Sequence, residues 1–405
     1  MNKKQVGAWA LFDFANSVYP AVITTTVFAI YYTDVVVGDE TGRGTFWWGL
    51  CVSVSALIVA STSPLLGAIA DRAGARKKFM LAYTIVCWVG VMSMIGLGPG
   101  MVIAGFLIFI VANVGFESAL VFYNAYLPDV APPEKQGWVS GMGFGVGYLG
   151  SALGLIMVIP FAAEHPEFVW PAVVAFFLVF SLPAFLYLPP DQSGRMSVPQ
   201  AAKWGVRNFR QIVREVWELK ELRNFLIAFF FYIDGVLTII VSAGIVATHT
   251  FGFTTGETMV LFLVVQFSAL IGAFALAKPT DTYGPKRILN GVLVLWIAAS
   301  VSAFFIQSQT LFWAMAVVVG FGLGSVQSAS RSFMSSLIPE GKEAAMFGFY
   351  ALCGKSSSVI GPLLFGGAAF VFSGNQRPGF LLIAGLFVIG LVLLQRVNDP
   401  RAAAS

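Results

Sequence analysis

The sequence predicts an all-α polytopic membrane protein whose transmembrane helices form two pseudo-symmetric six-helix bundles. Of its 405 residues, 58% are hydrophobic and only 11% are charged, whereas a soluble domain carries about a quarter charged residues. Apolar runs long enough to cross a bilayer, about 20 residues each, occur about twelve times. A polar motif between two such runs occurs again about two hundred residues later. The composition, the number of apolar runs and the repeated polar motif together indicate a duplicated membrane protein.

The repeated motif lies between the second and third apolar runs and again between the eighth and ninth. Its first copy reads G-A-I-A-D-R-A-G-A-R-K-K from Gly67 to Lys78. Four of its positions recur 210 residues later: Asp71, Gly74, Arg76 and Lys77 match Asp281, Gly284, Lys286 and Arg287 in that order. Glycine permits a tight interhelical turn, the carboxylate suits a helix N-terminus, and basic residues hold a loop on one side of a membrane. We expect a conformational role for Gly67, Asp71, Arg72, Gly74, Arg76 and Lys77, and for Asp281, Gly284, Lys286 and Arg287.

This motif resembles the loop between the second and third helices of the major facilitator superfamily, which is repeated between the eighth and ninth. The resemblance covers nearly the whole chain. It implies the superfamily's fold, two six-helix bundles that rock about a central site, and a role in transport.

The apolar runs set the expected helix boundaries. The first run contains polar residues and lacks a small-residue cleavage site, so we expect it to be a membrane helix and not a removed signal peptide. The expected spans are 8–33, 46–70, 79–98, 101–127, 137–162, 168–188, 224–249, 257–277, 287–307, 311–336, 343–372 and 379–397.

The loop charges predict the orientation. Twenty Lys and Arg residues fall in the terminal segments and loops of one side, and only Arg43 and Arg377 fall on the other. Because cytoplasmic loops carry the excess of basic residues, both termini and the central loop are expected in the cytoplasm. We expect a bacterial inner membrane, because the loops are compact.

Three parts are expected: an N-terminal bundle (1–189), a linker (190–223) and a C-terminal bundle (224–405). Ser197 and Gln200 have capping-box spacing. Apolar residues then recur at helical spacing among charges, which predicts an amphipathic helix on the membrane surface. This helix either simply joins the bundles or binds a regulatory partner.

The fifth and eleventh runs carry a second sign of duplication. Gly141, Gly147 and Gly154 recur as Gly348, Gly354 and Gly361, each 207 residues later. Small residues at this spacing allow close helix packing in a membrane.

Ionisable residues at bilayer depth are costly and usually face a cavity or a partner. Polar stripes follow the first, fourth, seventh and tenth runs, and in the superfamily these four helices line the central cavity. They either contact solute and protons or only pair with one another to hold the bundles. The candidate substrate or coupling residues are Asp13, Asn16, Asn113, Glu117, Tyr123, Asn124, Asp234, Gln327, Arg331 and Lys355.

Three stretches are more specific than the loop motif: W-A-L-F-D-F-A-N-S-V-Y (Trp9–Tyr19), F-Y-N-A-Y-L-P-D-V (Phe122–Val130) and the long segment Ser330–Leu363. They resemble the superfamily branch that includes the fungal vacuolar amino-acid effluxer of the autophagy pathway and its bacterial relatives. Over these stretches the branch pattern includes Asp13, Asn16, Asn124, Asp129, Arg331, Lys342 and Lys355. The resemblance implies a transporter and leaves the solute open.

We therefore expect a secondary active transporter that moves a small polar solute, such as an amino acid, by alternating access and with proton coupling. A lipid or amphiphile translocator of the same fold stays open, as do a channel, a non-transporting receptor and a membrane-embedded enzyme. Two distant histidines and dispersed cysteines give no metal site and no catalytic constellation. No cofactor and no nucleic acid are expected. The expected partners are the solute, protons and membrane lipids, and the chain is expected to be a monomer.

Overall fold

The computed structural model describes residues 1–400 except 39–41, 163–164, 193, 358–359 and 373–374, and within this part of the chain it is helical with no strand. The predicted all-α membrane fold is confirmed. Eleven helices in the described part are long and apolar enough to cross a membrane. They match eleven of the twelve expected spans to within a few residues. The remaining expected span, 343–372, includes two residues outside the described part.

Contacts group the chain into two compact units, which are described separately. Unit 1 comprises Met1–Val130, Val146–Phe209 and Pro339–Leu352. Unit 2 comprises Ala131–Gly145, Arg210–Ile338 and Cys353–Ser405.

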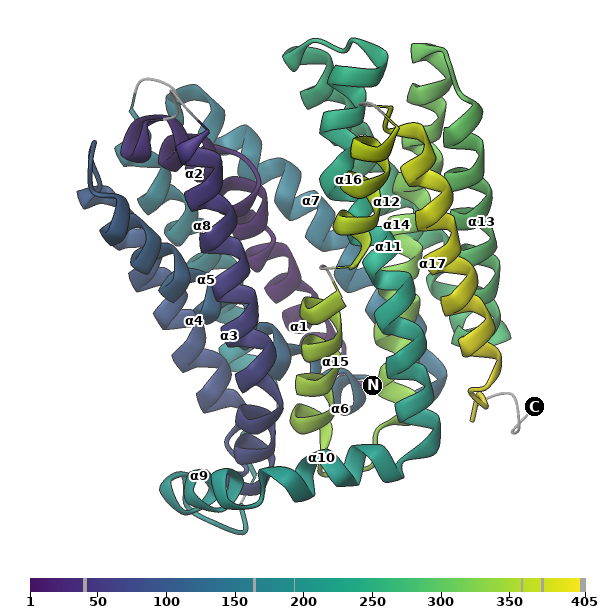
Figure 1. The fold of residues 1–405 in the computed structure, drawn as a ribbon. Helices are drawn as coiled ribbons and strands as arrows, with labels where there is room; N and C mark the ends of the chain where they lie inside the picture. Colours follow the sequence, from purple (N-terminus) through teal and green to yellow (C-terminus); the bar gives the residue numbers. More distant parts are fainter. Residues whose placement is uncertain (39–41, 163–164, 193, 358–359, 373–374, 401–405) are drawn as a thin grey trace. The chain divides into compact units, whose positions relative to one another are not determined.

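The helices of unit 1 pack mainly through apolar side chains. Within it α4 packs against α5, α5 also packs against α3, and α1 packs against α8 (Figure 1). Helix α7 begins in unit 2 and ends in unit 1. The elements up to the start of the linker are α1 (Lys3–Asn16), η1 (Pro20–Thr24), α2 (Val27–Ile30), η2 (Tyr31–Val37), α3 (Arg43–Ala73), α4 (Arg76–Ser93), η3 (Met94–Gly96), α5 (Val102–Asn124), α6 (Leu127–Val130), η4 (Pro133–Lys135), α7 (Gln136–Ala162) and α8 (Pro166–Tyr187).

The first span is not one regular α-helix, as the expected range 8–33 implied. Proline at position 20 has no N–H to donate, and the chain continues there as a π-helical turn, η1. The backbone N–H of Thr25 accordingly reaches back five residues to the carbonyl of Pro20 (3.0 Å). A second π-helical segment, η2, follows α2.

Unit 2 is built around α12 and α14, which pack along each other, while α17 packs against both α11 and α13 (Figure 1). Helix α15 begins in unit 1 and continues into unit 2. The remaining elements are α9 (Val198–Arg207), α10 (Phe209–Glu218), α11 (Lys220–Phe251), α12 (Thr255–Tyr283), α13 (Pro285–Phe305), α14 (Gln309–Leu337), α15 (Glu343–Ser357), α16 (Ile360–Val371) and α17 (Arg377–Gln395).

The expected amphipathic segment consists of two short helices, α9 and α10, that meet at Asn208. The capping box formed by Ser197 and Gln200 is present at the start of α9. Helix α9 packs on α3, where the Arg72 guanidinium lies 3.3 Å from the centroid of the Trp204 ring. This contact ties the start of the linker to the first loop motif.

Candidate functional site

The carboxylate of Asp71 binds the N-terminus of a helix that is distant in sequence. Its two oxygens accept the backbone N–H groups of Ala344 (3.1 Å) and Ala345 (2.8 Å), in the first turn of α15. The first N–H groups of a helix have no intrahelical partner and carry a partial positive charge. The side chain is 5% exposed, so water competes weakly for these bonds. All of these residues belong to unit 1.

The second copy of the motif makes the same contact inside unit 2. The two oxygens of Asp281 accept the backbone N–H groups of Gly137 (2.6 Å) and Trp138 (2.7 Å), in the first turn of α7. The two carboxylates are 210 residues apart and their donors are 207 residues apart. The carboxylates follow the 210-residue spacing of the loop motif, and their donors follow the 207-residue spacing of the glycine pattern. We call this repeated contact, one carboxylate bound to two N–H groups at a helix N-terminus, the carboxylate tether.

Glycines allow the tethered helices to approach closely. A Cβ atom on Gly67 would lie 2.1 Å from the carbonyl oxygen of Ala344. On Gly348 it would lie 2.4 Å from the carbonyl of Ser63, and on Gly141 it would lie 2.6 Å from that of Ala273. Ser63 and Ala273 are again 210 residues apart. The repeat therefore extends to backbone packing beside each tether.

Charged groups surround the first tether. Arg76 forms an ion pair with Asp129 (3.1 Å) and approaches Glu343 (3.7 Å) and Asp71 (4.0 Å). Burial raises the pKa of the Asp129 carboxyl above its ordinary value, Arg76 opposes this rise, and Glu343 adds to it. The matching positions in the second repeat are Ser336 for Asp129 and Gln136 for Glu343, which are neutral.

The lysines of the motif align differently from the sequence match, which paired Arg76 with Lys286 and Lys77 with Arg287. The backbone N–H of Lys77 donates to Asp191 (2.7 Å), and its ammonium group donates to the carbonyl of Leu188 (2.9 Å). Lys286 makes the equivalent contacts, with the Asp399 carboxylate (3.3 Å) and with a backbone carbonyl at Val397 (2.6 Å). Lys286 therefore corresponds to Lys77, because the second loop is one residue shorter after its glycine. Arg287 is exposed.

Two glycines provide the turns of the loops. Gly74 has φ +59° and lies close to the carbonyl of Gln192, while Gly284 has φ +84° and lies close to the Asp399 carboxylate. A side chain at either position would be strained by the positive φ.

The polar candidates of unit 1 lie on α1 and α5. Asp13 and Asn16 are buried, and the Nδ2 atom of Asn16 has no hydrogen-bond partner among the described residues. Asn113 donates to the hydroxyl of Ser55 (2.9 Å). Tyr123 is buried and stacks on Trp9, with ring centroids 4.7 Å apart. Glu117 and Asn124 are partly buried.

Unpartnered polar atoms in unit 1 extend beyond the predicted residues. The hydroxyl of Tyr19 and that of Ser118 are buried without a hydrogen-bond partner in the described part of the chain. Tyr19 stacks on Phe116, with ring centroids 4.5 Å apart. Buried polar groups are normally paired. These two hydroxyls therefore extend the candidate polar surface formed by the first membrane span and by α5.

In unit 2, Arg331 is buried in α14 and contacts the start of α7. Its Nε donates to the hydroxyl of Ser140 (3.0 Å), and its Nη2 donates to the carbonyl of the same residue (2.8 Å). The guanidinium lies 3.9 Å from the centroid of the Phe144 ring, which is favourable for a cation. The acceptors in these contacts are neutral oxygens.

The other candidates of unit 2 lie on three different helices. Asp234 on α11 is fully buried and accepts the backbone N–H of Gly361 (2.7 Å). Gln327 is half-buried on α14, and Lys355 lies near the end of α15. Within the described residues no group of three or more metal-ligating side chains is found.

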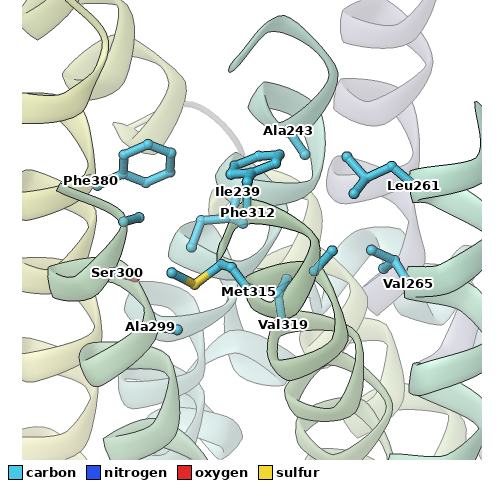
Figure 2. Close-up of a pocket in the computed structure, with 12 residues that line it drawn as sticks. Ile239, Ala243, Leu261, Val265, Ala299, Ser300, Phe312, Met315, Val319 and Phe380 are labelled. Atoms are coloured by element: carbon cyan, nitrogen blue, oxygen red, sulfur yellow. The ribbon is translucent and has the colours of Figure 1, made fainter. Parts of the chain in front are cut away.

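Unit 2 also contains an apolar pocket (Figure 2). It lies among α11, α12, α13, α14 and α17, and Ile239, Met315 and Phe380 are among its lining side chains. Ser300 is the polar residue of the lining, and its buried hydroxyl has no hydrogen-bond partner among the described residues. The lining suits an apolar group more than a charged one.

Sequence reasoning missed several partners of the predicted residues. Ser140 and Phe144, which bind Arg331, lie in a glycine-rich run that carried no charge signal. Asp191 lies 114 residues from Lys77, so spacing could not connect them. Gly361 was predicted as part of the glycine repeat, but nothing in that repeat connected it with Asp234.

The comparisons with known proteins agree with this architecture. Residues 48–405 match the family described as "Vacuole effluxer Atg22 like". The uncharacterized MFS-type transporter YxiO of Bacillus subtilis (strain 168) is 31% identical over 98% of this chain and 95% of its own length. Autophagy-related protein 22 of Coccidioides immitis (strain RS) is 25% identical over 86% of this chain and 72% of its own length.

Solved structures of low sequence identity share the fold. The human organic anion transporter MFSD10 (TETRAN) is 14% identical and has a TM-score of 0.78, covering 98% of this chain and 100% of that one. The proton:xylose symporter XylE is 12% identical and has a TM-score of 0.70, and the match covers 98% of this chain and 95% of that one. Together with the family match, these likenesses show that the chain is a membrane transporter that belongs to the Atg22-like family of the major facilitator superfamily.

Proposed function

We propose that the chain is a secondary active transporter that moves a small polar solute, such as an amino acid, by alternating access and with proton coupling. The repeated carboxylate tether carries this proposal. Each tether consists of two hydrogen bonds from a helix N-terminus to one carboxylate, Asp71 in unit 1 and Asp281 in unit 2. Such contacts can break and re-form without unfolding either helix, as alternating access about a midplane site requires.

The buried charges suggest the chemistry of the solute. Arg331 presents Nε and Nη2 to neutral oxygens of Ser140, and the guanidinium fork of arginine matches a carboxylate better. Glu117 and Asp234 are the carboxylates that an amino group or a proton would meet. Mixed signs favour a zwitterion over a neutral sugar. Membership of a family of vacuole effluxers is consistent with an amino acid as the solute.

The cellular setting belongs to the same proposal. The excess of basic residues on one side supports cytoplasmic termini, and the Bacillus relative supports a bacterial cell membrane. We further propose that the chain works as a monomer surrounded by membrane lipids, in three parts at 1–189, 190–223 and 224–405.

A thermal-shift screen tests the solute class. Purified protein is heated with amino acids, peptides, sugars and lysolipids, and an amino acid is expected to raise the melting temperature. A ligand at a hundredfold excess over its Kd stabilises the folded state by about 2.7 kcal/mol. Arg331→Ala should weaken the hit at least about 30-fold, since truncating one partner of a buried charge pair costs about 2–5 kcal/mol. Arg331→Lys should recover only part of the affinity.

Arg214→Ala is the matched control, because this arginine of unit 2 is 78% exposed in α10. Its ligand shift should equal that of the wild type. An undiminished shift in Arg331→Ala would remove Arg331 from the solute site. A screen in which only lysolipids stabilise the protein would contradict a polar solute.

The apolar pocket of unit 2 favours a second candidate, an amphiphile translocator. The pocket offers apolar side chains and the single unpartnered hydroxyl of Ser300. A lysolipid hit that is lost in Ala316→Trp, which would fill the pocket, would favour this candidate over the amino acid.

A further inference from the structure

Asp234 is a fully buried carboxylate, and only one of its two oxygens is hydrogen-bonded among the described residues. Its exposed fraction is 0%, as is that of Thr238, one helical turn later on α11. Oxygen Oδ2 accepts the backbone N–H of Gly361 (2.7 Å). Oxygen Oδ1 is buried and has no hydrogen-bond partner among the described residues. An ionised carboxylate in this position would lack the donors that a buried charge requires.

No cation compensates the carboxylate in the described part of the chain. Arg331 on α14 binds Ser140, and Tyr232 on α11 shares a hydrogen bond with Ser330 (2.7 Å). Helix α16 contains no titratable residue, and α17 contains Arg377 alone, at its first position. The other charged residues on α15 and α12 in unit 2 are Lys355, Glu257, Lys278 and Asp281.

The packing at Gly361 brings α16 directly against the unpaired oxygen of Asp234. A Cβ atom on Gly361 would lie 1.9 Å from the Thr238 hydroxyl oxygen and 3.0 Å from Oδ1 of Asp234. The Thr238 hydroxyl donates to the backbone carbonyl of Asp234 (2.7 Å), so it does not donate to the carboxylate. Helix α16 therefore meets α11 through a glycine placed directly against two oxygen atoms.

We propose that Asp234 is a protonation site: in this conformation it holds one proton on Oδ1, and that proton permits the close packing of α16 on α11. A protonated carboxyl keeps an acceptor oxygen for the N–H of Gly361 and removes the buried charge. Loss of the proton leaves a charge that only water or a cation can stabilise, so α16 must move away from α11. The role in coupling rests on the proposed transport function, whereas the presence of the proton does not.

Infrared spectroscopy tests the proton directly. The difference spectrum between the wild type and Asp234→Asn, both near neutral pH, should show the C=O band of a protonated carboxylic acid in the wild type alone. The band should shift in deuterium oxide. Asparagine keeps the size and one acceptor oxygen of the side chain, so the variant should fold. A difference confined to carboxylate bands would overturn the proposal, whatever the result of any transport assay.

Alanine substitutions at two glycines of α16 test its close packing on α11. Gly361→Ala should lower the melting temperature, and adding Thr238→Ala, which removes the hydroxyl, should restore part of the loss. Gly366→Ala in the same helix is the control, because its Cβ would meet nothing within 4 Å. Equal melting temperatures for the two glycine variants would contradict the close contact.

Transport in proteoliposomes tests the coupling. A gradient of one pH unit can drive at most a tenfold accumulation for each proton moved. Wild type and Gly366→Ala should show a gradient-dependent accumulation ratio, and in Asp234→Asn the ratio should no longer depend on the gradient. An unchanged dependence would show that Asp234 does not carry the coupled proton. If no solute is moved by the wild type, the proposed function fails and the infrared result still decides where the proton lies.

Discussion

Gly67→Ala is expected to abolish transport, whereas Gly49→Ala in the same helix is expected to leave it near the wild-type rate. A Cβ on Gly67 would lie 2.1 Å from the carbonyl oxygen of Ala344, and the next nearest atoms are also backbone. Backbone cannot give way as a flexible side chain can, so α15 would be pushed from α3 and both bonds to Asp71 would be lost. Overpacking of this kind typically costs about 1–3 kcal/mol or more.

The control is matched in helix and in substitution. A Cβ on Gly49 meets nothing within 4 Å, and alanine is the better helix former by up to about 1 kcal/mol. Transport rate and melting temperature should both be measured for the two variants. Similar rates for Gly67→Ala and Gly49→Ala would show that the contact between α3 and α15 is not needed.

Asp71→Ala and Asp281→Ala are each expected to reduce the transport rate at least tenfold. Each carboxylate accepts two N–H groups at a helix N-terminus, and a hydrogen bond to a charged group contributes about 1.5–3 kcal/mol. Loss of two such bonds lowers the population of the tethered conformation by more than tenfold. Asp71→Asn retains one acceptor oxygen and should fall between the wild type and the alanine variant.

Asp71→Ala should reduce the transport rate more than Asp281→Ala does. Asp71 shares its surroundings with Arg76, Asp129 and Glu343, whereas the equivalent positions in the second repeat are neutral. Removing Asp71 also leaves Arg76 with one acid fewer, so Asp71→Ala should be the more damaging. Initial transport rates at saturating solute measure this, and a rate in both variants close to that of the wild type would count against the tethers.

The sequence predicted the fold from features that do not depend on distant contacts. The lengths of the apolar runs and the loop charges report on local structure, and the 210-residue repeat reports on duplication. The observed helix boundaries agree with those expected from the apolar runs. The amphipathic segment was predicted as one helix and is two, because Asn208 interrupts it. Pro20 likewise changed the first helix in a way that hydropathy alone does not report.

The candidate site was less accessible to sequence reasoning. Burial at lipid depth identified Asp234 and Arg331, because charges are rare there. The groups found in contact with them include the N–H of Gly361 and the oxygens of Ser140, which are neutral and lie 127 and 191 residues away. Spacing along a helix cannot connect such groups. The alignment of Lys286 failed for a related reason, since a one-residue difference in a loop is visible only through its contacts.

Solute exchange in proteoliposomes tests most directly whether the chain transports by alternating access. Vesicles are loaded with unlabelled amino acid from the thermal-shift screen, and labelled amino acid is supplied outside. The labelled solute should accumulate transiently and saturably, because a site exposed to one side at a time exchanges one molecule for another. Arg331→Ala should abolish this accumulation. Entry of label that rises linearly with concentration and does not respond to internal solute would instead indicate a channel and contradict alternating access.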